Sequence, residues 1–375
     1  MNFTKDQKRN ILVVFLLVLL AVALTLAVVN PKIRNLEKEV ASDREILTDL
    51  FHRVDYREEP VIVIGHKNPD FDTTASAIGM AYLLNQLGIE AEARIAGPLN
   101  LETEYGLSVI GYPAPEILES AASRQLWLVD HSEYQLMVDG AEEARIVGIT
   151  DHHGIGDAET SELINVLSCP AGSTAAVVYT LCEKCGVDLP QDLAGVLLAG
   201  ILSDTANMKG NGVTALDEAA FEKLREISGI SDTDALYNGM LEARLSYKGM
   251  DDRDIYYSDY KEYETNGFLY GIGNIKVAHP EQVPEMAERM LRVIESEAKN
   301  GSEMQFLLFQ VYDPDYSLGY MGYTGNDAEL TEKLMDTAFG SVGQKQSTFY
   351  VFSPSLQRKT EVVPPIDDCL NDFTP

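Results

Sequence analysis

The pattern of apolar and polar residues divides the chain at residue 60 into an N-terminal segment and an α/β body. From residue 61, short apolar runs alternate with stretches of helical periodicity, which predict strands and helices respectively. The strands are expected at 61–65, 91–96, 125–129 and 145–150, and the helices at 74–87, 173–185, 191–202 and 216–228. This alternation predicts an α/β fold with a doubly wound parallel sheet that gathers its ligands at the carboxyl ends of the strands.

A second α/β unit follows a polar stretch at residues 246–253, which we interpret as a linker. Its strands are expected at 267–277, 303–312, 317–323 and 348–352, and its helices at 281–299 and 328–339. The order of these elements predicts a mixed sheet with helices packed against it. We therefore expect a larger domain at 60–245 and a smaller one at 254–375, each long enough to bury its own core.

The N-terminal segment contains an apolar run at residues 11–29 in which Thr25 is the one polar residue. A helix of this length spans about 28 Å, close to the hydrocarbon thickness of a bilayer. The run predicts a transmembrane helix after a tail of residues 1–10; a core helix would be less uniform, and a cleaved signal peptide usually has a shorter apolar region. Basic residues after the run slightly favour a single-pass membrane protein whose catalytic part is cytoplasmic.

Residues 31–58 form a stretch in which apolar side chains recur at steps of three and four residues. The positions are Ile33, Leu36, Val40, Leu47, Leu50 and Val54, with Asp43 at the missed step. This spacing predicts a helical stalk. The stalk either dimerises as a short coiled coil, which would make the protein a homodimer, or lies as a single amphipathic helix against the body. The spacing allows both.

Composition narrows the range of partners. The formal charge is −30, and because residues 1–60 are balanced, all of it lies in residues 61–375. Such a body repels nucleic acid, so we expect no nucleic-acid partner. The four cysteines are too few for a disulfide framework. Cys182 and Cys185 have the spacing of half a zinc site, but no second pair follows, so we expect reduced thiols.

Acidic and imidazole side chains gather where predicted elements end. They occur in HKNPDFD at 66–72, DHSE at 130–133, DHH at 151–153 and at Asp204. The strand ends of a doubly wound sheet share one edge, so these segments can converge. Crowded carboxylates repel one another unless cations lie among them. Oxygen ligands mixed with imidazole suit manganese, cobalt or magnesium, so the sequence predicts a divalent metal centre.

These segments also carry a family resemblance. GHKNPDFDTTASAI, VDHSE, DHH and ILSDT, in this order, resemble the signature segments of the DHH phosphoesterase superfamily, and the first resembles that of the family II (manganese-dependent) inorganic pyrophosphatases. NLET at 100–103, GSTA at 172–175, DYKEY at 259–263 and QRKTEVVPP at 357–365 are similar to that family too. The resemblance implies a DHH metal-binding catalytic domain, a C-terminal substrate-clamp domain, and an active site in the cleft between them.

The resemblance implies roles for particular residues. The implied metal ligands are His66, Asp70, Asp72, Asp130, His152 and Asp204, which would hold two or more Mn²⁺ ions, or Co²⁺ or Mg²⁺, with Asp130 as the bridge. The implied catalytic residues are His153, a proton donor, with Asp130 and Asp70. The implied substrate-binding residues are Lys261, Arg358, Lys359 and His153. The sequence departs from the family at Ser132, Gly154 and Thr360, none of which is an implied ligand.

The expected function is hydrolysis of inorganic pyrophosphate to two phosphates by a metal-bridged hydroxide, in an enzyme tethered to the membrane through residues 11–29. One alternative is a phosphoesterase of the same superfamily that acts on short polyphosphate or a nucleotide phosphodiester. Another is a catalytically silent membrane protein that senses phosphate or pyrophosphate. The 357–365 segment suits a short anionic substrate and argues against the first alternative; the complete ligand set argues against the second.

Overall fold

The computed structural model describes residue 32 and residues 38–373, which form two compact units. The first unit is Met1–Leu99 with Ile110–Thr233, and the second is Asn100–Val109 with Asp234–Pro375. The division falls after Thr233, upstream of the stretch interpreted as a linker. Helices α3 (Leu101–Ile110) and α7 (Thr233–Leu245) meet in the second unit, where Arg244 Nη1 lies 3.0 Å from Glu102 Oε2.

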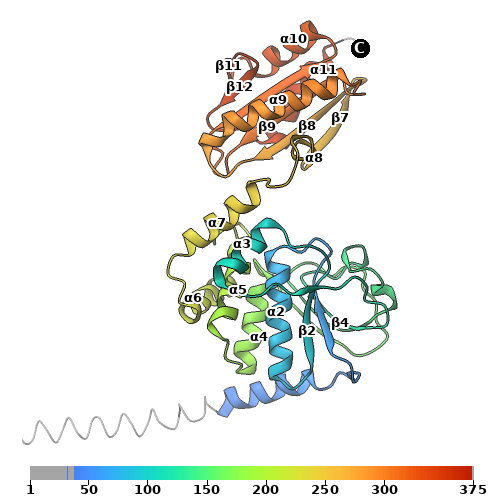
Figure 1. Cartoon of the computed structure of the whole chain (residues 1–375), viewed down its shortest axis with the longest axis vertical. Coiled ribbons are helices and arrows are strands. Elements are labelled where there is room, and N and C mark those ends of the chain that lie inside the picture. Colours follow the sequence, from blue (N-terminus) through green and yellow to red (C-terminus); the bar gives the residue numbers. More distant parts are fainter. Residues whose placement is uncertain (1–31, 33–37, 374–375) are drawn as a thin grey trace, which may run out of the picture. The chain divides into compact units, whose positions relative to one another are not determined.

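The first unit is built on a six-stranded sheet in which every pair of neighbouring strands is parallel (Figure 1). The strand order is β3-β2-β1-β4-β5-β6. The strands are β1 (Val61–Ile64), β2 (Ala91–Ile95), β3 (Glu116–Ile117), β4 (Gln125–Val129), β5 (Arg145–Asp151) and β6 (Asn165–Ser168). The central strands β1 and β4 are fully buried, as expected for strands that are almost entirely apolar. The predicted parallel sheet is confirmed.

Different kinds of structure cover the two faces of this sheet. Helix α2 (Phe71–Gln86) contacts β1 and β2, and α4 (Thr174–Cys185), α5 (Gln191–Asp204) and α6 (Ala215–Ser228) pack around it and one another. A segment with two 3₁₀ helices, η1 (Tyr134–Leu136) and η2 (Ala141–Glu143), supplies Met137 and Val138 to a separate cluster with Ile62 and Leu126. The helices on one face and the 3₁₀ segment on the other both exclude water from the sheet. Burial of apolar surface in this way is the main contribution to the stability of the fold.

Local capping explains where the functional helices begin. Asp70 is the N-cap of α2, and its side chain accepts a hydrogen bond from the Thr73 backbone N–H at 2.9 Å. Ser173 caps α4 in the same way through Ala176. A short oxygen-bearing side chain at this position satisfies a backbone donor that the helix leaves unpaired. The caps place acidic side chains at the positive end of the α2 dipole.

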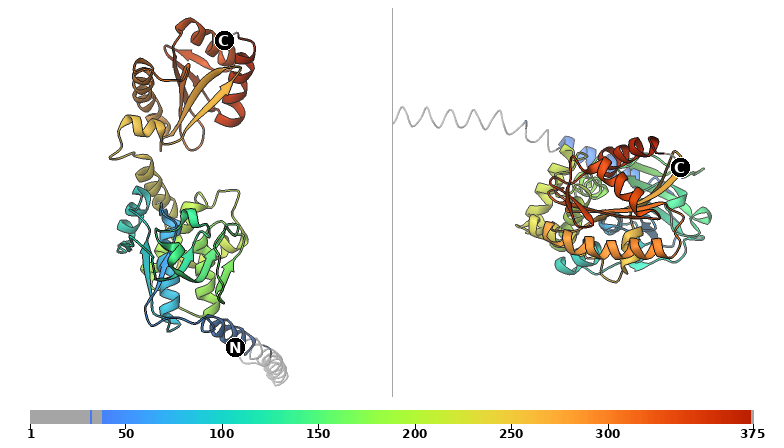
Figure 2. Two further views of the ribbon diagram at one scale, coloured as in Figure 1. Left: turned by 90° about the vertical axis from the view of Figure 1, so that its right-hand side faces the viewer. Right: turned by 90° about the horizontal axis from the view of Figure 1, so that it is seen from above.

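The second unit contains a mixed sheet of order β11-β12-β10-β9-β8-β7, in which β8 and β9 are parallel and the other neighbours antiparallel. The strands are β7 (Tyr260–Thr265), β8 (Phe268–Lys276), β9 (Phe306–Tyr312), β10 (Gly319–Gly325), β11 (Gln344–Gln346) and β12 (Phe349–Phe352). Helix α9 (Val283–Lys299) covers one face with α8 (Asp252–Tyr257), and α10 (Ala328–Phe339) and α11 (Val363–Asn371) cover the other (Figure 2). The predicted mixed sheet is confirmed.

The predicted stalk lies partly within the described residues. Residues 38–51 form a helix, which we call the stalk helix. Its last residue, Phe51, is buried and stacks on Trp127 of β4 with ring centroids 5.7 Å apart. The C-terminal end of the stalk helix is therefore anchored on the first unit.

The predicted membrane localisation requires correction. Among the residues that the structure describes, no helix combines the length and the apolar character that crossing a bilayer demands. The long helix α9, for example, has 17 residues and carries charged side chains such as Arg289, Arg292 and Glu295. Residues 11–29, the predicted span, lie outside the described residues. The described residues therefore give no support to the predicted single-pass localisation with a cytoplasmic catalytic part, and that prediction is withdrawn.

Candidate metal centre

The six predicted metal ligands come from the ends of five elements of the first unit. His66 follows β1, Asp70 and Asp72 begin α2, Asp130 follows β4, His152 follows β5 and Asp204 ends α5. Parallel strands end at one edge of their sheet, and the turns that leave β1, β4 and β5 project from that edge. The topology therefore gathers side chains that lie more than a hundred residues apart in the sequence.

The potential ligand atoms form three overlapping groups, within each of which all atoms lie within 4.8 Å of one another. The groups are His66, Asp70 and Asp130; Asp130, His152 and His153; and Asp72, His152 and Asp204. Asp130 is shared by two groups. Its Oδ2 lies 3.5 Å from His66 Nε2, and its Oδ1 lies 3.5 Å from His152 Nε2. A carboxylate whose two oxygens face different imidazoles is placed to bridge two cations.

The remaining distances are consistent with shared cations. Asp70 Oδ2 lies 3.5 Å from His66 Nε2, and Asp204 Oδ2 lies 3.6 Å from His152 Nε2. These separations exceed those of good hydrogen bonds. They leave room for an ion that contacts both atoms of a pair.

His152 provides a direct test of whether the site fits a metal ion. Its Nδ1 lies 2.9 Å from the Ala171 carbonyl oxygen, which fixes the orientation of the ring. Its Nε2 is buried and has no hydrogen-bond partner among the described residues, although it faces Asp130 and Asp204. Buried polar atoms are normally paired. An imidazole held by a carbonyl at one nitrogen and presented to carboxylates at the other has the arrangement of a metal ligand.

Hydroxyl and backbone donors hold the buried carboxylates in place. Asp130 adopts a left-handed backbone conformation, with φ of 64°, and accepts hydrogen bonds from the Thr73 and Thr174 hydroxyls. Asp72 accepts from the backbone N–H groups of Thr174 and Ala175, at 2.6 and 2.8 Å, at the N-terminus of α4. Neither Thr73 nor Thr174 was predicted to have a role, although both lie in segments that resemble the family, DTT at 72–74 and GSTA at 172–175.

The electrostatics show a site that attracts positive charge. Burial raises the pKa of Asp72 well above its usual value, and the negative charges of Asp130 and Asp204 raise it further. Burial by itself would lower the pKa of His66, but hydrogen bonds to Asp130 and Asp70 outweigh it and raise the pKa to about 10. Without bound cations, the cluster therefore retains protons at neutral pH.

Two further histidines lie beside the cluster. His153 is more than half exposed, and its Nδ1 lies 3.0 Å from Asp151 Oδ1 and 3.7 Å from Asp130 Oδ1. The hydrogen bond to Asp151 raises the pKa of His153 to about 9. His131, which the sequence analysis left without a role, is buried and packs edge-on against the His66 ring, with centroids 6.3 Å apart. Its place next to Asp130 in the VDHSE segment was the signal.

The three predicted phosphate-binding residues lie together in the second unit. Lys261 on β7 and Arg358 and Lys359, in a π-helical turn at Arg358–Val362, line a cavity of about 390 Å³. Arg358 donates from Nη1 to the Asp259 carbonyl and from Nη2 to Asp259 Oδ1, both at 2.7 Å. These bonds fix the guanidinium, and they help to hold the pKa of Asp259 below its usual value although burial opposes this. The cavity is suited to an anion.

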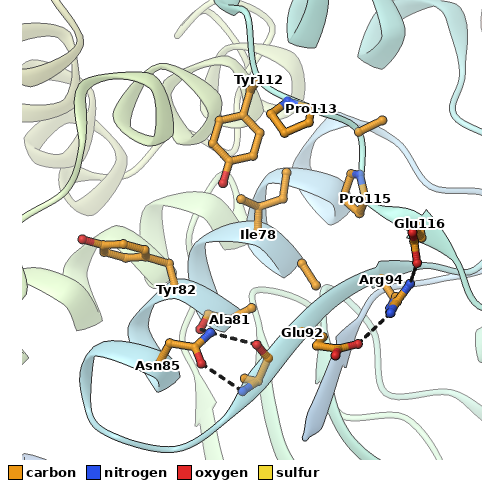
Figure 3. Close-up of a pocket in the computed structure, with 13 residues that line it drawn as sticks. Ile78, Ala81, Tyr82, Asn85, Glu92, Arg94, Tyr112, Pro113, Pro115 and Glu116 are labelled. Atoms are coloured by element: carbon orange, nitrogen blue, oxygen red, sulfur yellow. Dashed lines mark hydrogen bonds and ion pairs between the residues drawn. The ribbon is translucent and has the colours of Figure 1, made fainter.

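A separate pocket lacks both the acidic cluster and the basic residues of the two sites described above. It lies beside α2 and β2 and is lined by Ile78, Tyr82, Tyr112 and Pro113, among others (Figure 3). Its charged residues are already paired, since Arg94 forms ion pairs with Glu92 and Glu116 (Figure 3). None of the predicted site residues lines it.

Comparison with known proteins agrees with this division of the chain. Residues 60–201 match the DHH family, N-terminal domain, and residues 238–369 match the DHHA2 domain. A manganese-dependent inorganic pyrophosphatase from Methanocaldococcus jannaschii is 34% identical over 317 residues, which cover 82% of this chain and 99% of the relative. Another, from Methanothrix thermoacetophila, is 32% identical over 308 residues, covering 82% and 97%.

The chain belongs to the manganese-dependent inorganic pyrophosphatase family. A crystal structure from Methanococcus jannaschii, assigned to the family II inorganic pyrophosphatases, superposes with a TM-score of 0.53 at 32% identity and covers 82% of this chain and 99% of that one. Membership of this family supports Mn²⁺ as the cofactor, in agreement with the mixed carboxylate and imidazole donor set.

The departures from the family pattern lie around the cluster and the cavity. Ser132 is buried, and its hydroxyl accepts a hydrogen bond from the Gly156 N–H at 2.7 Å. A side chain at Gly154 would meet no atom within 4 Å, so this position is open. Thr360 lies exposed in the turn that carries Arg358 and Lys359. None of the three belongs to the three ligand groups.

Proposed function

We propose that this protein hydrolyses inorganic pyrophosphate to two phosphates at the cluster centred on Asp130. The observation that carries the proposal is the sharing of Asp130 between two groups of potential ligands. Asp130 would be shared between two bound cations, and paired cations of this kind can stabilise both the attacking and the leaving oxygen in phosphoryl transfer. The relatives named manganese-dependent inorganic pyrophosphatases support the choice of substrate.

The proposed ligands are His66, Asp70, Asp72, Asp130, His152 and Asp204. Bound Mn²⁺ would supply Lewis acidity, which lowers the pKa of water and offsets the charge of the phosphates. The chain's own part is to fix the donors. Thr73 and Thr174 hold both oxygens of Asp130, and the α4 N-terminus holds Asp72. Rigid donors need little rearrangement when the ions bind.

His153 is the proposed proton donor. Its Nδ1 is engaged by Asp151, so Nε2 is the nitrogen left to face a phosphate at the rim of the cluster. The hydrogen bond to Asp151 raises the pKa of His153 in the metal-free chain, which favours the protonated ring. A protonated imidazole can transfer its proton to the departing phosphate.

The proposed phosphate-binding residues are Lys261, Arg358 and Lys359. Pyrophosphate is highly anionic, and the body of the chain carries a charge of −30, so the substrate needs a local concentration of positive charge. Arg358 offers planar, fixed donors, whereas the two lysines act as mobile point charges.

The two alternative functions are not favoured. The family that the chain belongs to is defined by pyrophosphatases, not by phosphodiesterases or polyphosphatases. A silent sensor would not need three complete ligand groups that share one bridging carboxylate.

The test is phosphate release by the full chain with pyrophosphate, short polyphosphate and a dinucleotide as substrates, in Mn²⁺, Mg²⁺ or chelator. We expect pyrophosphate to be the preferred substrate and chelator to abolish release. Asp130→Asn removes the bridging charge and should lower turnover at least about a hundredfold. Asp188→Asn, a change at an exposed carboxylate outside the cluster, is the matched control and should keep full activity. A lack of pyrophosphate turnover with any metal would overturn the proposal.

A further inference from the structure

One short segment of the first unit contacts three of the predicted metal ligands. It comprises residues 171–175, which lead into α4, and we call it the α4 entry segment. The Ala171 carbonyl oxygen contacts an imidazole Nδ1, the Thr174 hydroxyl donates to one carboxylate, and the backbone N–H groups of Thr174 and Ala175 donate to another. The ligands held in this way come from three different elements: Asp72 of α2, Asp130 after β4 and His152 after β5. The position of this segment therefore affects three ligands at once.

The α4 entry segment is itself held by Asp217, a fully buried carboxylate of α6. Asp217 Oδ2 accepts a hydrogen bond from the Gly172 backbone N–H at 2.7 Å, and Oδ1 accepts one from the Ser173 hydroxyl at 3.3 Å. A carboxylate is costly to bury unless its oxygens are paired. The bonds to Gly172 and Ser173 thus hold Asp217 and the segment against each other.

Capping of α6 does not by itself account for the position of Asp217. Asp217 is the third residue of α6, and its Oδ2 accepts from the Thr214 backbone N–H at 2.9 Å, which is the reciprocal half of a capping box. The Thr214 hydroxyl donates to the same oxygen at 2.7 Å. A carboxylate that served only this cap could stay at the surface, whereas Asp217 is buried and directs its other oxygen at Ser173.

Close packing around Gly172 keeps the segment in contact with Asp217. A Cβ added at Gly172 would lie 2.8 Å from Thr205 Cγ2 and 3.1 Å from Asp217 Oδ2. A glycine is therefore needed here for the carboxylate to reach the backbone N–H. Thr205 directly follows Asp204 at the end of α5, so the segment also packs against the neighbour of a fourth predicted ligand.

We propose that Asp217 is a positioning residue of the metal centre. It belongs to none of the three ligand groups, and it acts by fixing the α4 entry segment, which in turn orients the three ligands that the segment contacts. This inference rests on the metal centre of the proposed function, but it does not depend on pyrophosphate being the substrate.

Calorimetric titration of the full chain with Mn²⁺, in the absence of substrate, tests the proposal. Asp217→Ala releases the segment and should lower Mn²⁺ affinity about 10- to 100-fold, the range typical for the loss of a group that supports metal ligands. Thr214→Val removes a hydroxyl from the same cap but leaves the bonds of Asp217 to the segment. It should lower the stability of the fold without changing Mn²⁺ affinity. Equal losses of affinity in the two variants, or none in Asp217→Ala, would overturn the proposal.

Asp217→Asn separates the effect of position from that of charge. The amide oxygen can still accept from the backbone N–H groups of Gly172 and Thr214, so this variant should recover most of the Mn²⁺ affinity that Asp217→Ala loses. If Asn were as damaging as Ala, the negative charge rather than the hydrogen bonds would be what matters, and the positioning role would be wrong.

A pair of glycine variants keeps the test valid even if Asp217→Ala fails to fold. Gly172→Ala displaces the segment from an unaltered Asp217 and should also weaken Mn²⁺ binding, whereas Gly212→Ala, at an open position before α6, should not. Circular dichroism establishes that both variants are folded. Equal Mn²⁺ affinities of the two glycine variants would contradict the proposal.

The same titrations distinguish this inference from the proposed function. A wild-type chain that bound no Mn²⁺ would refute the metal centre and the proposed function with it. A wild-type chain that bound Mn²⁺ no more tightly than a folded Asp217→Ala variant would refute only the role of Asp217.

Discussion

Asp130 is the residue on which the metal centre depends. It is buried, its two oxygens face His66 and His152, and hydrogen bonds from these surroundings outweigh burial and lower its pKa. The Thr174 hydroxyl contacts the same carboxylate at 2.8 Å. Thr174 contacts no substrate in the proposed mechanism, but it holds the carboxylate of Asp130 in position.

Thr174→Val keeps the shape of this side chain and removes its hydroxyl. Because Asp130 loses a donor that orients it, we expect Mn²⁺ affinity to fall about tenfold, as is typical when the support of a metal ligand is removed. Thr180→Val on the same helix, whose hydroxyl bonds only the Ala176 carbonyl, is the control. Calorimetric Mn²⁺ titrations of both variants make the comparison, and equal affinities would show that Thr174 has no positioning role.

Arg358→Ala tests the second unit at the same scale. Removing the fixed guanidinium should raise KM for pyrophosphate about 10- to 100-fold, because charge-assisted bidentate contacts are among the strongest. Mn²⁺ affinity should not change, since the ligand groups lie in the first unit. Arg289→Ala removes an arginine paired with Asp252 and is the control. A fall in metal affinity with an unchanged KM would refute this division of roles.

At the scale of elements, strand β5 leads into the DHH segment and is tightly packed against Trp127 of β4. Its pairing with β4 shifts register near Leu126, so that Trp127 lies opposite Gly148. The Trp127 ring fills the space above this glycine and donates from Nε1 to the Thr150 hydroxyl at 2.9 Å. The chain continues directly from Thr150 into Asp151, His152 and His153. The packing of Trp127 on β5 therefore helps to position these three residues.

Gly148→Ala should destabilise the first unit. An added Cβ would lie 2.4 Å from Trp127 Cδ2, and the buried ring has no free space into which to move. Overpacking of this kind costs about 1–3 kcal/mol. Gly154→Ala, where an added Cβ meets nothing within 4 Å, should cost far less. Chemical denaturation in chelator compares the two, and equal midpoints would disprove the packing argument.

At the scale of the whole molecule, two separately cored units divide the chemistry. The first carries the acidic cluster, and the second carries the basic cavity. Concentrated negative charge makes the first unit dependent on bound cations. Its stability should therefore respond to both metal and pH.

The metal-free protein should lose stability as the pH rises from about 6.5 towards 10. His66 has a folded pKa of about 10, above the ordinary value of 6.5, so its protonation stabilises the folded state fully below 6.5, and this contribution is lost as the pH approaches 10. Mn²⁺ should replace the missing charge and stabilise more at about pH 9 than at about pH 6.5, where protons compete for the ligands.

Thermal unfolding in chelator and in Mn²⁺ at both pH values measures the effect. His66→Gln should reduce the pH dependence of the metal-free protein. If the metal-free protein instead became more stable towards pH 9, the proposed protonation of the cluster would be wrong.

The sequence alone determined the fold class, because this depends on local pattern, and it supplied the candidate ligands through the resemblance of its ordered motifs to a known family. Apolar runs such as 61–64 and 125–129 predict buried strands, and side chains at the carboxyl ends of parallel strands must lie at one edge of the sheet. Strands with a polar pattern were harder to predict. Strand β7 mixes two tyrosines with charged residues, and β3 and β11 are two and three residues long, so none of these edge strands was predicted.

Only the tertiary structure decided which groups support the ligands and which surfaces remain open. The hydroxyls of Thr73 and Thr174 reach Asp130 across 57 and 44 residues of sequence, and no local pattern reports such a distance. The heptad spacing of the stalk was compatible with burial or exposure until the position of Phe51 was known. Periodicity shows that a helix has an apolar face, but what covers that face depends on where the rest of the chain packs.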